Sequence, residues 1–188
     1  MSYDKRKLKF REMRGLTILE LMVVIAVIGI MGSISVPFFS RYNDQCSVNA
    51  AMTDILNMIM EAKLRALYGN NHAVHFGSDG TVTLLSNAGN DGKWGTGDDV
   101  VVKSFRIGEV GRGLRFGYGS FGPIPKLADH QDGITFNDHV AICNNDMTGT
   151  AGTVYVISPS GNAMALVLNS TDSGYAVWKW VGTKWIKK

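Results

Sequence analysis

Leu16 to Phe39 reads LTILELMVVIAVIGIMGSISVPFF, a run of 24 residues that contains one charged side chain, Glu20. A helix of this length can cross the roughly 30 Å hydrocarbon core of a bilayer. A carboxylate in lipid costs roughly 2.5 to 3.5 kcal/mol on insertion scales, so Glu20 needs a partner. The nearest candidate is the amine released if the chain is cut between Gly15 and Leu16. That amine lies one helical turn from Glu20, on the same chain or on a neighbouring one.

Residues 1–15, which precede the run, are basic: six Lys or Arg stand against Asp4 and Glu12. The chain's formal charge of +3 minus the leader's +4 leaves −1 for the rest. In an ordinary secretory signal the cut follows the apolar segment and removes it. A cut after Gly15 would instead remove the basic part and keep the apolar run. Positive charge before the run predicts a cytoplasmic N-terminus and an exported C-terminal domain.

The sequence RGLTILEL, residues 14–21, resembles the class III signal of type IV pilins and pseudopilins. The resemblance implies cleavage between Gly15 and Leu16 by a prepilin peptidase, N-methylation of Leu16, and assembly of the apolar helices into a filament core. The family usually has Phe where this chain has Leu16, and leucine keeps the apolar start. Non-enzymatic filament subunits of this kind are made as inner-membrane precursors.

Glu20, Gly29 and Pro37 are the residues that the resemblance connects with assembly. The carboxylate of Glu20 would meet the amine of Leu16 and so fix the height at which a subunit docks. Gly and Pro both disfavour a helix, Pro because it removes a backbone hydrogen bond and clashes one turn back. They are either tolerated, as is common in membrane helices, or they mark a stretch between Gly29 and Pro37 that melts on assembly, as in pilin-like filaments.

Beyond Phe39 the helical pattern continues to Tyr68, and Gly69 ends it. We therefore expect one helix from Leu16 to Tyr68. Apolar residues at spacings of three and four predict one buried stripe along its second half. The members of this stripe are Val48, Met52, Ile55, Ile59, Ala62 and Ala66.

From residue 72 onward, short β-rich runs alternate with turn residues, which predicts an antiparallel sheet without a second helix. The helix should pack on that sheet, which makes an α+β fold. We expect three parts: a leader, 1–15; a transmembrane or filament-core helix, 16–39; and an amphipathic helix half with a β-rich domain, 40–188. The expected strands are 73–76, 81–85, 100–105, 114–118, 134–136, 140–143, 153–158, 163–168 and 175–181. Their order resembles the GspH/FimT family of minor pseudopilins and minor pilins.

An enzymatic function is not expected. His72 and His75 are three apart in an expected strand, so their side chains point to opposite faces and cannot share a metal. His139 and Cys143 lack a motif in which one would activate the other. Cys46 and Cys143 would lie in an oxidising compartment, so they form either a disulfide or two unpaired thiols.

The loop from Asn87 to Asp99 is rich in Asn, Asp and Gly, and two interpretations of it remain. It is either a solvated hairpin insertion, whose polar residues form turns, or a calcium loop. Its oxygen ligands suit Ca²⁺, but the spacing is not that of an EF-hand. The expected calcium ligands are Asp91, Asp98 and Asp99. We expect no other cofactor.

The C-terminal tail combines three tryptophans with lysines and has no acidic residue. Aromatic rings beside cations are the composition that single-stranded nucleic acid prefers, although rings on one strand face can equally pack together. The candidate DNA contacts are Lys179, Lys184, Trp185, Lys187 and Lys188. Some FimT-like pilins bind DNA through a basic C-terminus, but their arginine-rich pattern is missing here.

Together these observations predict a structural subunit, a minor pilin or pseudopilin, of a type IV pilus or a type II secretion pseudopilus. The alternatives are a DNA-binding minor pilin and a major filament subunit. The resemblance implies other pilin subunits, a prepilin peptidase, an inner-membrane assembly platform and membrane lipid as partners. The expected location is a single pass through the inner membrane with a periplasmic C-terminal domain, followed by the filament.

Overall fold

The computed structural model describes residues 17–170 and 174–188. The chain divides into two compact units, Met1–Ser40 and Arg41–Lys188. Helix α1 spans Ile18–Leu67 and contributes to both units. Its ends lie within two residues of those expected, so the prediction of one long helix is confirmed. The helix includes Gly29 and Pro37, and melting on assembly stays a prediction because it concerns the assembled filament.

The second half of α1 packs on the C-terminal unit through the stripe that its spacing predicts. All six residues of this stripe, Val48, Met52, Ile55, Ile59, Ala62 and Ala66, are buried. On the opposite side, Glu61 forms ion pairs with Arg65, one turn along the helix, and with Lys103. An amphipathic helix gains most of its stability from such tertiary packing of its apolar face.

The C-terminal unit contains two antiparallel sheets, where the sequence analysis expected one. Sheet A has the strand order β3-β2-β1-β5, and sheet B has the order β4-β6-β7-β8-β9. Sheet A consists of β1 (His72–Phe76), β2 (Thr81–Asn87), β3 (Val100–Arg106) and β5 (Val140–Cys143). Sheet B consists of β4 (Arg115–Phe116), β6 (Gly152–Ile157), β7 (Ala163–Leu168), β8 (Tyr175–Val181) and β9 (Lys184–Lys187). The α+β class itself is confirmed.

Two local expectations are wrong, and one strand of the tail was not expected. Residues 134–136 do not form a strand; Ile134 makes only an isolated bridge to Val154. One short second helix exists, α2 (Ile107–Val110), and two single 3₁₀ turns follow, η1 (Gly119–Phe121) and η2 (Asn137–His139). The tail continues beyond β8 into a hairpin with β9, in which Trp180 pairs with Trp185.

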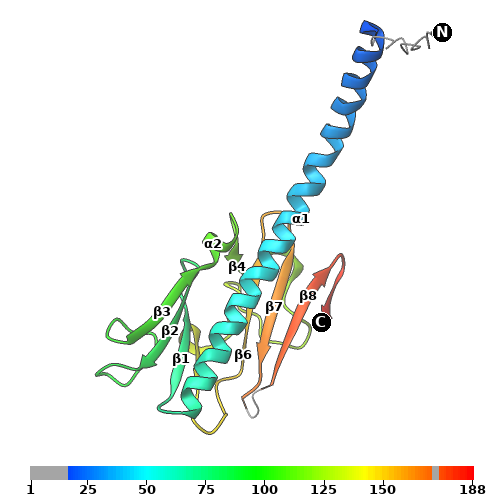
Figure 1. The fold of residues 1–188 in the computed structure, drawn as a ribbon. Helices are drawn as coiled ribbons and strands as arrows, with labels where there is room; N and C mark the ends of the chain where they lie inside the picture. The colour runs from blue at the N-terminus through cyan, green and yellow to red at the C-terminus, as the bar shows by residue number, and fades with distance from the viewer. Residues whose placement is uncertain (1–16, 171–173) are drawn as a thin grey trace, which may run out of the picture. The chain divides into compact units, whose positions relative to one another are not determined.

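The main core lies between α1 and the faces of both sheets that are turned toward it. In Figure 1 the second half of α1 runs with β1–β3 on one side of it and with β7 and β8 on the other. Val74 and Phe76 of sheet A, and Val154 and Leu166 of sheet B, belong to the same buried cluster as the helix stripe. One helix therefore joins the two sheets into a single hydrophobic core.

Aromatic rings fill the junction between the sheets. The ring of Phe76 stacks on Phe136 with centroids 5.6 Å apart and meets Phe116 edge-on at 5.9 Å. At Gly152 a Cβ atom would lie 2.3 Å from the ring of Phe136, so only glycine fits at the start of β6. Each sheet also carries a second, smaller buried cluster, in addition to the main core.

Candidate functional site

The candidate site is the beginning of α1, where the single charge of the apolar run lies. Thr17 precedes the first helical residue. The side chain of Thr17 binds the backbone of Glu20, and the side chain of Glu20 binds the backbone of Thr17. The Thr17 hydroxyl accepts the N–H of Glu20 at 3.2 Å, and Glu20 Oε2 accepts the Thr17 N–H at 2.9 Å. The hydroxyl of Thr17 also donates to Oε2, at 3.0 Å. This reciprocal pair is a capping box, which satisfies free N–H groups of the first turn.

The capping box turns the carboxylate toward the N-terminal end of the chain. Both hydrogen bonds that the carboxylate accepts end on Oε2, and no contact of Oε1 is seen in the described part of the chain. Among the described residues, Oε1 is therefore open to a further donor. Gly15 and Leu16, where cleavage is expected, lie outside the described residues.

The described side chains of the apolar run, residues 17–35, 38 and 39, are all exposed. The side chain of Ile18 is 80% exposed, and that of Phe39, at the other end of the run, is 73% exposed. By length and composition this helix is apolar enough to cross a membrane. Ser33 and Ser35 donate their hydroxyls to the carbonyls of Ile30 and Met31, at 2.7 Å each. These two hydroxyls are thus satisfied within the helix, as an apolar surrounding requires.

The tail tryptophans are part of a second core. Trp185 is 7% exposed, and its Nε1–H donates to the carbonyl of Gly122 at 3.1 Å. Its ring meets those of Tyr155 and Trp180 at 5.5 and 5.6 Å, and Trp180 stacks on Phe121 at 4.7 Å. This placement leaves little of the Trp185 ring for stacking with a base, in contrast to its expected role in DNA contact.

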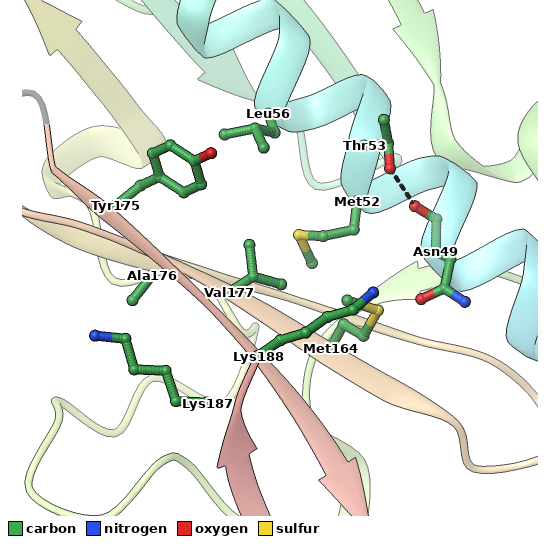
Figure 2. Close-up of a pocket in the computed structure, with 10 residues that line it drawn as sticks. All are labelled: Asn49, Met52, Thr53, Leu56, Met164, Tyr175, Ala176, Val177, Lys187 and Lys188. Atoms are coloured by element: carbon green, nitrogen blue, oxygen red, sulfur yellow. Dashed lines mark hydrogen bonds between the residues drawn. The ribbon is translucent and has the colours of Figure 1, made fainter.

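The tail lysines are divided between the two faces of sheet B. Cross-strand partners share a face, so Lys179 lies on the helix-facing side with its partner Met164, whereas Lys187 lies on the other side with Trp178. Figure 2 shows Lys188 extending along a groove toward Asn49, while Lys187 points away from it. This groove between α1 and β8 has a volume of about 450 Å³.

Binding of single-stranded DNA gives a testable consequence of this arrangement. Because the Trp185 ring is buried, we expect any affinity to be purely electrostatic and to disappear between about 50 and 200 mM salt. Fluorescence anisotropy of a labelled oligonucleotide with the full chain in detergent measures this. Replacing all four lysines, Lys179, Lys184, Lys187 and Lys188, by alanine should remove the affinity that remains at low salt. Tight binding at about 200 mM salt would indicate base stacking and contradict the expectation.

The aspartates of the loop from Asn87 to Asp99 accept hydrogen bonds from the loop itself. Asp91 Oδ1 accepts the N–H of Lys93 at 2.8 Å. Asp98 accepts the N–H of Asn90 and the hydroxyl of Thr96, both at 2.7 Å. The Thr96 hydroxyl, followed by the Asn90 N–H, holds the pKa of Asp98 below its ordinary value.

Asp99 Oδ2 accepts two further backbone N–H groups of this loop, from Gly95 at 2.7 Å and from Thr96 at 2.9 Å. Within residues 17–170 and 174–188, no three His, Cys, Asp or Glu side chains are grouped so that they could hold a metal ion. The three expected calcium ligands, Asp91, Asp98 and Asp99, are thus found as turn-forming residues.

Cys46 and Cys143 are not bonded to each other. Cys46 is exposed on α1, and Cys143 is buried at the end of β5. Burial raises the pKa of the Cys143 thiol to about 11. Of the two alternatives open from the sequence, the structure has the pair of free thiols.

Two features of the structure are absent from the sequence-based expectations. The Thr17–Glu20 capping box has a readable signal, since Thr or Ser three residues before an acidic residue at the head of an apolar run is its pattern. The packing of Trp94 against Ala73, Leu85 and Val140 has no signal in the sequence, because it depends on how the loop folds back over sheet A.

Comparison of the chain with protein families, curated proteins and solved structures finds no match. The chain consists of a long apolar N-terminal helix followed by antiparallel sheets, which is a pilin-like order of elements.

Proposed function

We propose that this chain is a structural, non-enzymatic subunit of a type IV pilus or of a type II secretion pseudopilus. In this proposal it is a minor pilin or pseudopilin with a single pass through the inner membrane and a periplasmic C-terminal unit. A prepilin peptidase removes residues 1–15, and Leu16 is methylated. The inner-membrane assembly platform then transfers the subunit into a filament of pilin subunits.

One observation carries the proposal: the apolar run at the start of α1, long enough to span a membrane, has its only charged side chain in the first turn of the helix, where a capping box holds it. For a helix that only spans lipid, a carboxylate is a cost without a benefit. The Thr17 N–H binds Glu20 Oε2 at 2.9 Å, so the carboxylate faces the end of the helix at which cleavage would create an amine. A filament core in which amine and carboxylate meet uses that charge.

Processing of the leader provides the test. We expect Gly15→Val to leave the precursor uncut, because a side chain at the residue before the cut would crowd a peptidase site shaped for glycine. Intact-mass measurement of membrane-extracted protein distinguishes the precursor from a mature form that begins at a methylated Leu16.

Gly29→Ala is the matched control, since a Cβ at Gly29 meets nothing within 4 Å. This variant should be cut like the wild type. A mature form beginning at Leu16 in the Gly15→Val protein, or a wild-type chain that keeps its leader in a host with an active prepilin peptidase, would refute the proposed processing.

A further inference from the structure

The loop between β2 and β3 lies on the face of sheet A opposite α1. Trp94 packs there against a small buried cluster formed by Ala73, Leu85 and Val140. Ala73 of β1 pairs with Leu85 of β2, and Val140 of β5 pairs with His75, two residues further along β1. The loop is thus a largely exposed hairpin insertion, as one interpretation of its composition has it, but it also folds back as a flap, residues 88–99, that covers part of the sheet.

The backbone of the flap lies directly over His75. Gly95 has a φ of +86°, and a Cβ there would lie 2.9 Å from Val140 Cγ2 and 3.3 Å from His75 Cδ2. Asp99 fixes this approach, because its Oδ2 accepts the N–H of Gly95 at 2.7 Å. Its other oxygen, Oδ1, is buried without a hydrogen-bond partner in the described part of the chain.

Charged groups approach His75 from several elements. From η2 comes His139, which is paired with Asp132 at 2.8 Å. From the flap comes Asp99, and from the β1–β2 turn comes Asp79, which binds Arg106 at 2.7 Å. The β2 partner of His75 is the uncharged Thr83.

Burial, and next the positive charge of His139, lower the pKa of His75 below its ordinary value of 6.5, against the opposing effect of Asp99 and Asp79. An environment that lowers the pKa of a histidine stabilises its neutral form relative to its protonated form. Of these effects, only burial and the charge of Asp99 depend on the flap, because His139 and Asp79 lie on other elements and stay in place when it opens. Burial is the largest of the effects, so the docked flap binds fewer protons at His75 than the open flap. The contribution of neutral His75 to the stability of the docked flap is fully present above pH 6.5, and it is lost as the pH falls below that value.

We propose that residues 88–99 form a proton-sensitive flap that stays docked while His75 is neutral and opens when His75 takes up a proton. Opening would expose the apolar cluster of Ala73, Leu85 and Val140 as a surface that is hidden at neutral pH. This inference is independent of the proposed filament function, because every group that it uses lies within the C-terminal unit.

The position of Trp94 reports the state of the flap. The full chain in detergent, labelled with fluorotryptophan, gives one fluorine NMR signal for each of its four tryptophans. The signal lost in Trp94→Phe belongs to the flap. Between about pH 8 and pH 5, the range in which histidine titrates, we expect this signal alone to move, with a midpoint below 6.5.

Gly95→Ala provides the reference for the open state, because its Cβ would clash with Val140 at every pH. The low-pH signal of the wild type should coincide with the signal of this variant. If the Trp94 signal does not move, or if it moves only together with the three tail signals, the proposal is wrong, since the latter outcome reports global unfolding.

Histidine variants identify the titrating group. His75→Gln should abolish the transition, whereas His72→Gln, whose Nδ1 lies 2.8 Å from the carbonyl of Asn70, should keep it. His139→Gln should raise the midpoint, because it removes a positive charge that disfavours protonation of His75. A transition that persists in His75→Gln would overturn the proposal. If His75→Gln leaves the flap open at all pH values, the His139→Gln shift decides, and an unchanged midpoint there refutes the proposal.

Discussion

The Glu20→Ala chain is expected to insert into the membrane and to be cleaved like the wild type, yet to be missing from filaments. Insertion should be equal or better, because the penalty of roughly 2.5 to 3.5 kcal/mol for the carboxylate disappears. Assembly should fail because the amine of Leu16 would enter the helix bundle without a negative partner, and an unpaired buried charge costs several kcal/mol. Sheared filaments, compared with membranes for the amount of mature subunit, measure the two steps separately.

The capping box makes a sharper comparison possible. Glu20→Gln removes the charge but keeps an acceptor for the N–H of Thr17, since Gln serves in a capping box as Glu does. If pairing with the amine is the function of Glu20, Glu20→Gln should fail in assembly as well. If helix capping is its only role, this variant should assemble normally, and wild-type amounts of either variant in filaments would refute the pairing.

Trp185→Ala should lower the free energy of unfolding of the C-terminal unit by about 3–5 kcal/mol, the usual range for a buried large aromatic residue. The ring is 7% exposed and lies against Tyr155 and Trp180. The substitution also leaves the carbonyl of Gly122 without the indole N–H that it accepts at 3.1 Å. Urea unfolding, followed by circular dichroism in the β region, measures the loss.

Lys187→Ala is the control for this experiment, because it changes an exposed residue on the same strand. Surface substitutions of this kind usually stay within about 0.5 kcal/mol of the wild type. A Trp185→Ala protein that is as stable as the Lys187→Ala protein would mean that β9 does not contribute to the core.

Local patterns in the sequence predicted the elements of this fold well. The spacing of apolar residues between Val48 and Ala66 gave the buried face of α1, because periodicity directly reflects helix geometry. Alternating β-rich runs located most of the strands. The number of sheets could not be predicted in this way, because the pairing of β1 with β5 joins segments that lie far apart in the chain.

The sequence was less informative where a residue's role depends on its distant neighbours. The composition of the tail suggested stacking with nucleic acid, whereas Trp185 packs on Tyr155, from another strand. The Asn- and Asp-rich loop suggested a solvated turn or a calcium site; it forms exposed turns, but the sequence did not indicate that Trp94 also holds it on the sheet. In both cases one aromatic side chain, rather than the polar residues around it, decides the outcome.

The two free cysteines differ enough to be used as a chemical tool. Thiol reagents attack the thiolate, and a buried thiol with a pKa of about 11 has almost none at neutral pH. Cys143 should therefore stay unlabelled, while the exposed Cys46 reacts. Because Cys46 lies six residues beyond Ser40, where the apolar unit ends, a fluorophore attached there would report when a subunit leaves the bilayer. The native chain needs no engineered cysteine for such a real-time measurement of membrane extraction.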